Sequence, residues 1–207
     1  MRYGTLEYRL CYLDFETFGT AIPLFDDVRP YERIPFQFSL HIVESGEKKS
    51  RHESFFADGN SDPRPEILQL LKKLLGDKGS IVAYNAPFEK DKLRKACDVF
   101  TDFPKWYQSI EPRFVDLLVP FKSFYYYHPD QHGSASIKAV LPALTGKSYD
   151  RLEMADGGTA SLEYLQITFG DVDEKERHKV RRQLEKYCAL DTEGMRMIVD
   201  ALEAIIS

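Results

Sequence analysis

Two carboxylates stand inside an apolar segment near the start of the chain. The segment is CYLDFETFGT, residues 11–20, and it places Asp14 and Glu16 two positions apart. Residues i and i+2 of a β-strand project from the same face, so these two side chains would lie side by side. Burying two adjacent carboxylates is costly unless positive charge compensates for them. The pair predicts either a solvated edge strand or a cation site, and its apolar and aromatic neighbours favour a central, buried strand.

A second acidic position follows a short apolar run at residues 81–84, in the sequence NAPFEKDKL. The run predicts a buried strand that ends at Asn85, with a helix beginning near Pro87. Glu89 then falls in the first helical turn, where an acid is also favoured by the helix dipole alone. Asp91 is a rival acid about 200° further around the helix, so only one of the two can face a common centre.

A third position lies in the sequence YCALD, where Tyr187 and Asp191 are separated by four residues. This spacing puts both side chains on one face of a helix. Asp191 lies at the edge of an apolar stripe, so it is either a salt-bridge partner or a metal ligand. The stripe consists of Val180, Leu184, Cys188, Met195, Val199 and Leu202.

The order of these three motifs resembles that of the DEDD superfamily of 3′–5′ exonucleases, which have a ribonuclease H-like fold. Asp14 and Glu16 match the D-x-E motif of the first strand. Tyr187 and Asp191 match the Y-x-x-x-D motif of the tyrosine branch. Lys186 stands where the histidine branch would have its histidine, five residues before the last aspartate.

The second motif of that superfamily is N-x-x-F-D, often with a leucine four residues beyond the acid. Asn85, Phe88 and Leu93 match it, but Glu89 stands where aspartate is usual. The glutamate is one methylene longer, so it could reach the same ion or shift to an outer-sphere contact. Metal preference and rate are therefore the properties that this departure puts in question.

The resemblance implies a phosphodiester hydrolase with two Mg²⁺ or Mn²⁺ ions, because hard divalent ions prefer carboxylate oxygens. It implies that Asp14 bridges both ions, that Glu16 and Asp191 hold the ion that activates water, and that Glu89 assists. Tyr187 would orient the attacking water, since a phenol with a pKa of about 10 is a poor base at neutral pH. Thr17 and Asn85 are expected to contact the substrate, although Asn85 could instead fix the strand-to-helix turn. Asp116 is expected to cap a helix rather than bind metal.

A narrower resemblance connects three longer segments with a bacterial family described as a domain of unknown function in the ribonuclease H-like clan. The segments are LDFETFGTAIPLFDDVRPYERIPFQFSLHI, YYYHPDQHGSASIKAVLPALTG and YCALDTEGM. In that family the domain is often the C-terminal part of a longer protein. The chain is therefore expected to be either an excised domain or a stand-alone version.

The pattern of elements predicts an α/β fold of the ribonuclease H-like class, a mixed sheet flanked by helices. Strands are predicted at residues 10–15, 36–43, 51–57, 81–84 and 114–115, with a hairpin turn at 44–50. Helices are predicted at 65–75, from near residue 87, and at 136–144, 160–169 and about 174–205. The long loop 19–35 leaves the strand that carries Asp14 and Glu16 and is expected to overhang whatever binds there.

Composition sets outer limits on the class of protein. The chain has 207 residues, is 43% hydrophobic and has a formal net charge of −5, which fits one domain over residues 1–207 and excludes wholesale disorder. The charge argues against a passive nucleic-acid coat but allows an enzyme that holds phosphates through metal ions. Cys11, Cys97 and Cys188 form no C-x-x-C pair, so we expect reduced core thiols in a cytoplasmic protein. No signal peptide or membrane-length apolar run is present, so no membrane partner is expected.

Together with the acidic motifs, the resemblance implies a metal-dependent 3′–5′ exonuclease that acts on single-stranded DNA or RNA. Two alternatives remain: a catalytically silent nucleic-acid-binding domain of the same fold, and an endonuclease of the same clan. Residues 90–95 (KDKLRK) are expected to be a solvated helix face from which Lys90 or Lys92 can reach phosphate. The aromatic cluster at residues 124–127 is expected to be core or interface, with base stacking as the alternative.

Overall fold

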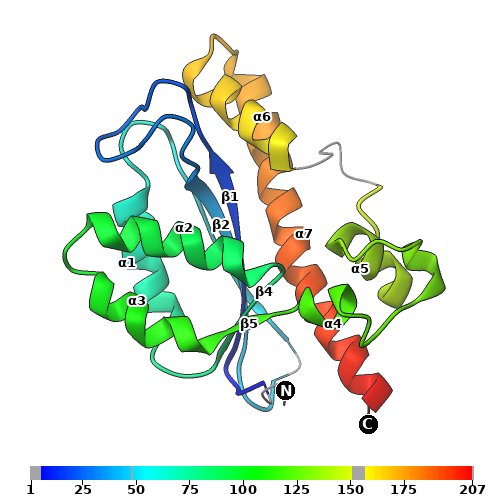
Figure 1. The fold of residues 1–207 in the computed structure, drawn as a ribbon. Helices are drawn as coiled ribbons and strands as arrows, with labels where there is room; N and C mark the ends of the chain where they lie inside the picture. The colour runs from blue at the N-terminus through cyan, green and yellow to red at the C-terminus, as the bar shows by residue number, and fades with distance from the viewer. Residues whose placement is uncertain (1–5, 48, 151–156, 207) are drawn as a thin grey trace.

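The computed structural model describes residues 6–47, 49–150 and 157–206, which form a five-stranded sheet with helices on both faces (Figure 1). The strands are β1 (Leu10–Phe18), β2 (Ile34–Val43), β3 (Arg51–Phe56), β4 (Ser80–Ala83) and β5 (Phe114–Asp116). The helices are α1 (Arg64–Leu75), α2 (Ala86–Val99), α3 (Pro104–Ile110), α4 (Val119–Lys122), α5 (Ile137–Thr145), α6 (Gly157–Phe169) and α7 (Glu174–Ile206). Two short 3₁₀ segments are η1 (Glu111–Arg113) and η2 (Pro129–Gln131).

The strand order is β3-β2-β1-β4-β5, so the strand that carries the first two acids is central, as predicted. β2 is antiparallel to both β1 and β3, whereas β4 is parallel to β1 and to β5. β2 accompanies β1 as far as Phe18, but β4 pairs with β1 only as far as Tyr12. The second half of β1 therefore has an edge that β4 does not cover. Crevices of this kind, beyond the carboxyl ends of parallel strands, are frequent ligand sites in α/β proteins.

Alternate residues of β1 face two different layers of helices. Cys11, Leu13 and Phe15 pack into the core formed with α1, α2 and α3. Tyr12 packs on the opposite side, in the core formed with α5 and α7. Asp14 has the same parity as Tyr12 and lies on the side of the sheet along which α7 runs (Figure 1). The carboxylates of β1 are therefore placed under α7 by the two-residue period of the strand.

The α/β class, the mixed sheet and the flanking helices agree with the prediction, with two differences. β1 continues to Phe18 and β2 begins at Ile34, so the loop between them is shorter than predicted. Helix α3 was not predicted, because it has only seven residues and is stabilised mainly by packing of Tyr107 and Ile110 into the core. β2 and β3 pair as the predicted hairpin, although residue 48 of its turn lies outside the described residues.

Cysteine state and membrane-spanning potential can also be compared with the sequence. Cys11, Cys97 and Cys188 are all free and buried, as predicted. Cys97 lies in the core between the sheet and α1–α3, whereas Cys188 lies on α7 against Asp14. In the part of the chain that the structure describes, no helix combines the length and hydropathy needed to cross a bilayer.

Candidate metal centre

The five side chains predicted to carry the chemistry line a single pocket of about 210 Å³. They are Asp14, Glu16, Glu89, Tyr187 and Asp191. The other lining residues are Phe15, Thr17, Arg33, Phe88 and Gly157. Three separate elements thus contribute the acids: the central strand β1, the first turn of α2 and the middle of α7 (Figure 1). Thr17, an expected substrate contact, lines the pocket, and so does Phe88 of the second motif.

Glu89 reaches the site because the chain turns sharply between β4 and α2. Asn85 has a left-handed backbone (φ 76°), so α2 begins at the next residue beside the uncovered edge of β1. The backbone amide of Phe15 on that edge donates a hydrogen bond to the Glu89 carboxylate. The first turn of α2 thus takes the place of the strand pairing that β4 is too short to supply.

The turn before α2 is held by hydrogen bonds to Asp116. One Asp116 carboxylate oxygen accepts hydrogen bonds from the backbone amides of Asn85 and Leu118, both at 3.0 Å. Neither Asn85 nor Asp116 lines the pocket, and the Asn85 side chain is exposed. Asp116 therefore stabilises the strand-to-helix turn, but it is not the helix N-cap that the sequence predicted, because α4 begins after Leu118 and α2 after Asn85.

The structure distinguishes Glu89 from its rival Asp91. Asp91 forms salt bridges with Lys92 and Lys95 at 3.0 Å and with Arg94 at 3.1 Å. Burial works against its charge, but the hydrogen bonds from Lys92 and Lys95 outweigh it and lower the pKa of Asp91 to about 2. Glu89 is buried at the pocket, whereas Asp91 belongs to a surface ion-pair cluster on the other side of α2.

Negative charge is concentrated in the pocket, and the nearby cations of the described residues do not offset it. Burial raises the pKa of Asp14 well above its usual value, and the carboxylates of Glu89 and Asp191 raise it further. Burial likewise raises the pKa of Glu89, with Glu16 as the largest neighbouring cause. Burial raises the pKa of Asp191 to about 6, although a hydrogen bond from Tyr149 opposes the shift. Such mutual destabilisation is relieved by a bound cation.

The donor set fits hard divalent cations. One ligand atom from each of Asp14, Glu16 and Cys188 lies within 4.8 Å of the others. The Glu89 Oε2 atom is buried and has no hydrogen-bond partner among the described residues, so a polar acceptor at the pocket is left unsatisfied. Burial keeps the pKa of Cys188 well above its usual value, and its thiol donates to Asp14 Oδ2 at 3.3 Å. With the thiol protonated, the available ligands are carboxylate oxygens, which Mg²⁺ and Mn²⁺ prefer.

Several residues of the site were not predicted from the sequence. Tyr149 donates a hydrogen bond to Asp191 Oδ1, and the Lys138 ammonium lies 5.0 Å from the centre of the Tyr187 ring. Lys138 also favours the charged form of Asp191 and so lowers its pKa. Arg33 lies in the loop that was expected to overhang the site, so the length of this loop indicated that one of its residues could reach the pocket. Tyr149 and Lys138 lie far from the three motifs in sequence, and no spacing marks them.

The comparisons with known proteins place the chain in a family. The model of the "Domain of unknown function (DUF2779)" matches residues 11–136, which is more than half of the chain and includes Asp14, Glu16 and Glu89. The chain is 26% identical to the "Uncharacterized protein MG366 homolog" of Mycoplasma pneumoniae, over 92% of this chain and 31% of that protein. It is 25% identical to the "Uncharacterized protein MG366" of Mycoplasma genitalium, over 99% of this chain and 33% of that protein. The chain thus spans about a third of the length of these curated relatives. The match of the family model identifies the chain as a member of the DUF2779 family.

Proposed function

We propose that this protein is a metal-dependent nuclease of the ribonuclease H-like class that releases nucleotides from the 3′ end of single-stranded DNA or RNA. One observation carries the proposal: acids from three separate elements line one small pocket, and one of their buried oxygens lacks a partner among the described residues. A pocket of this kind is costly for the protein to maintain unless it binds cations. Sites with strongly perturbed carboxylates are also where chemistry is most often found.

The sheet supports the ribonuclease H-like part of the proposal. Its order is 3-2-1-4-5, with β1, β2 and β3 antiparallel and β4 and β5 parallel to β1. The acids lie on the central strand, at the end where β4 has already stopped. This arrangement positions α2 and α7 on opposite sides of β1, so each helix can contribute one acid to the same centre.

The proposed division of labour follows from which groups line the pocket. Asp14, Glu16, Glu89 and Asp191 would hold two Mg²⁺ or Mn²⁺ ions. When bound, such a pair of ions stabilises the charge that develops on the attacking and leaving oxygens of a phosphodiester. The protein supplies a pre-shaped set of oxygen ligands, and the hydrogen bond from the Phe15 amide holds Glu89 in place.

Tyr187 and Arg33 would act on water and on phosphate, respectively. Burial raises the pKa of Tyr187, and the nearby carboxylates raise it further, so its hydroxyl stays protonated near neutral pH. A protonated phenol donates a hydrogen bond, which suits orientation of a water molecule rather than removal of its proton. Arg33 lines the same pocket and brings a guanidinium, which matches the geometry of phosphate oxygens.

The function is tested with single-stranded DNA and RNA labelled at the 5′ end, incubated with Mg²⁺, Mn²⁺ or EDTA. A ladder of products shortened from the 3′ end, dependent on metal, is the expected result. A single internal cut would favour the endonuclease instead. Intact substrate under every metal condition, with binding retained, would favour the catalytically silent binding domain. That domain is the second candidate because position 89 has a glutamate in place of the usual aspartate.

A Tyr149→Phe substitution is expected to weaken metal binding more than catalysis at saturating metal. The phenol holds one Asp191 oxygen by a hydrogen bond, and groups that orient a ligand typically contribute about 10- to 100-fold to metal affinity or activity. The metal concentration that gives half-maximal cleavage should therefore rise by about tenfold or more. A metal titration of the cleavage rate measures this. Tyr126→Phe, which alters a tyrosine packed on Phe121 outside the pocket, is the matched control, and equal midpoints for both variants would contradict the role of Tyr149.

A further inference from the structure

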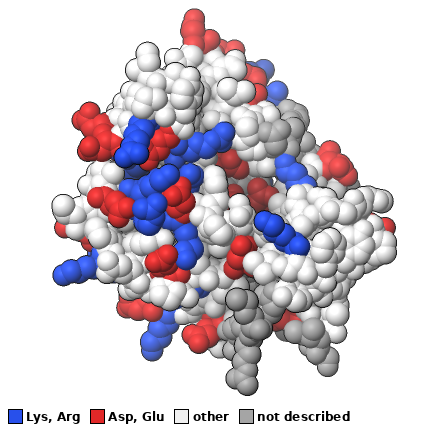
Figure 2. Space-filling model, in the orientation of Figure 1, with Lys and Arg blue, Asp and Glu red and all other residues white. Residues whose placement is uncertain are grey.

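A larger groove opens beside the acidic pocket, between α2 and the loop that joins β1 to β2. Its volume is about 980 Å³. The basic residues that line it are Arg29, Arg33, Lys92, Arg94 and Lys95. Figure 2 shows Lys and Arg side chains gathered over α2 and this loop, on one side of the recess that contains acidic atoms. Because Arg33 lines both the groove and the acidic pocket, the two form one continuous surface.

The cations of the groove differ in how far the protein neutralises them. Arg94 pairs with Asp98 at 3.1 Å, and Lys92 and Lys95 share Asp91. By contrast, the guanidinium groups of Arg29 and Arg33 form no salt bridge with any residue that the structure describes. The loop thus presents two exposed guanidinium groups without an ion-pair partner among the described residues, beside Asp27 and Glu32, which also line the groove.

The loop that carries these arginines is held in place by hydrogen bonds to its backbone. Arg64 is buried, pairs with Asp62 at 2.7 Å, and donates to the backbone carbonyls of Asp26 at 2.8 Å and Asp27 at 3.4 Å. At the base of the loop, the Tyr31 amide donates to the Thr20 carbonyl at 2.8 Å. The arginines are therefore positioned before any ligand arrives, which lowers the entropic cost of binding.

The groove also offers an aromatic surface. Tyr31 lines the groove, and its side chain is 74% exposed. Its backbone has a positive φ of 60°, which is uncommon for a residue other than glycine. Exposed aromatic rings beside basic side chains are the combination that binds unpaired bases and the phosphates that link them. At the other end, the Lys92 ammonium lies 4.8 Å from the centre of the Phe88 ring, which itself lines the acidic pocket.

We propose that this groove binds the sugar–phosphate backbone of a single-stranded nucleic acid whose end enters the acidic pocket. Arg29 and Arg33 would contact phosphates, Lys95 would add charge, and Tyr31 would stack on a base. The orientation of the bound nucleic acid rests on the proposed function, because it assumes that the 3′ end lies in the acidic pocket. Binding in the groove, however, requires no cleavage and can be measured separately.

The test is fluorescence anisotropy with labelled oligothymidylate and oligouridylate of about 12 nucleotides, long enough for a single-strand groove. EDTA is present so that no cleavage occurs. The variant is Arg29→Gln with Lys95→Gln, which spares Arg33 because that residue also lines the acidic pocket. Loss of two positive charges from the groove should weaken binding about fivefold or more at low salt and flatten the log–log salt slope by up to about 1.4. Tyr31→Ala should weaken binding about fivefold with an unchanged salt slope, because stacking releases no counterions.

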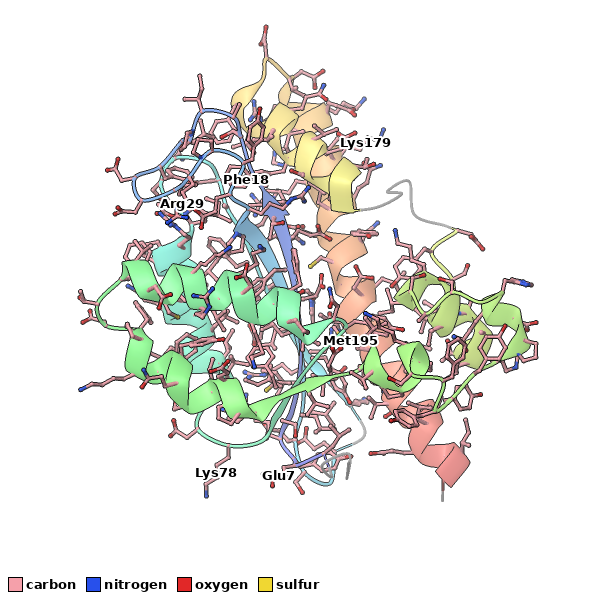
Figure 3. All side chains as sticks on the ribbon, in the orientation of Figure 1. Glu7, Phe18, Arg29, Lys78, Lys179 and Met195 are labelled. Atoms are coloured by element: carbon pink, nitrogen blue, oxygen red, sulfur yellow. The ribbon has the colours of Figure 1, made fainter. Side chains whose placement is uncertain are left out.

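The matched control is Lys78→Gln with Lys179→Gln, which removes the same net charge elsewhere. Figure 3 places Lys78 and Lys179 well apart from Arg29. This control should keep the affinity within about twofold of the wild type. Equal losses in both double variants, or no loss in the groove variant, would overturn the groove as the binding surface. Arg29, Lys78 and Lys179 are exposed and Lys95 is partly exposed. Circular dichroism of both variants checks that they fold.

The outcomes also separate this inference from the nuclease proposal. A protein that binds single strands through the groove but cleaves none would support the groove and sink the nuclease. A protein that cleaves single strands, with unchanged affinity in the groove variant, would support the nuclease and overturn the groove. A wild-type protein with no affinity for either oligonucleotide overturns the groove directly.

Discussion

An Asp14→Asn substitution is expected to abolish metal-dependent cleavage while making the metal-free protein more stable. Asp14 lies in the centre of β1, and burial together with the carboxylates of Glu89 and Asp191 raises its pKa. The amide keeps the shape of the side chain but cannot supply a charged ligand. Cleavage should fall by about 10³-fold or more, because several kcal/mol of transition-state stabilisation depend on the bound ions.

The free energy of unfolding of the metal-free protein should rise because the substitution removes repulsion. Without metal, the asparagine takes one negative charge out of a buried acidic cluster, which stabilises the folded state. For a chain of this size, each kcal/mol corresponds to about 2–4 °C in the midpoint of thermal unfolding. Melting curves in EDTA measure the gain, and cleavage of labelled single strands with Mn²⁺ measures the loss.

Asp91→Asn is the control for this experiment, since it removes a carboxylate from the same part of the chain. Asp91 pairs with Lys92, Arg94 and Lys95 outside the pocket, so cleavage should persist in this variant. Its stability should not increase in EDTA, because the change removes attraction instead of repulsion. Cleavage at the wild-type rate by the Asp14→Asn variant, or a lower melting temperature of that variant in EDTA, would contradict the assignment of the metal centre.

The metal-free protein is expected to lose stability as the pH rises, and Mg²⁺ or Mn²⁺ to restore it. The folded state raises the pKa of Asp191 from 3.8 to about 6 and raises those of Asp14 and Glu89 well above their usual values. Groups with raised pKa values bind protons more tightly when folded. Their favourable contribution is fully present below the unfolded pKa and disappears as the pH rises through the folded pKa. For Asp191 alone, this contribution to the free energy of unfolding is on the order of 3 kcal/mol, and it is lost between about pH 4 and pH 6.

The measurement is thermal unfolding in EDTA across this pH range, repeated with Mg²⁺ or Mn²⁺. Because cations bind the ionised pocket, the metal-induced increase in melting temperature should grow with pH. Asp14→Asn should show a flatter pH dependence and a smaller increase with metal. Metal-free stability that rises steadily over the same range, or melting temperatures that ignore both ions at neutral pH, would count against a metal centre in this pocket.

Much of the candidate site followed from local spacing. The two-residue period of a strand puts Asp14 and Glu16 on one face, and the helical period does the same for Tyr187 and Asp191. Those relations hold wherever the elements lie in the fold. The choice between Glu89 and Asp91 also had a local signal, since Leu93 lies one turn after Glu89 and is buried in the core. Packing of that face of α2 turns Glu89 inward and leaves Asp91 at the surface.

Other parts of the site depend on contacts that sequence spacing does not encode. Tyr149 is 42 residues from the aspartate to which it donates, and Lys138 reaches Tyr187 from α5. Helix α3 was missed for a related reason, since a seven-residue helix gains little from its own hydrogen bonds and depends on its neighbours. The basic groove was visible in the sequence only as a solvated stretch of lysine and arginine on one helix.

The sequence by itself determined which residue types could bind a divalent cation, which pairs of them share a face, and the class of fold that carries them. Only the tertiary structure decided that acids from β1, α2 and α7 line the same pocket. The physical reason is the short β4, which ends level with Tyr12 and leaves the edge of β1 open to α2 on one side while α7 crosses the other face. Strand length and helix packing are products of the whole core, so no local pattern could reveal that the carboxylates of CYLDFETFGT meet two others from distant parts of the chain.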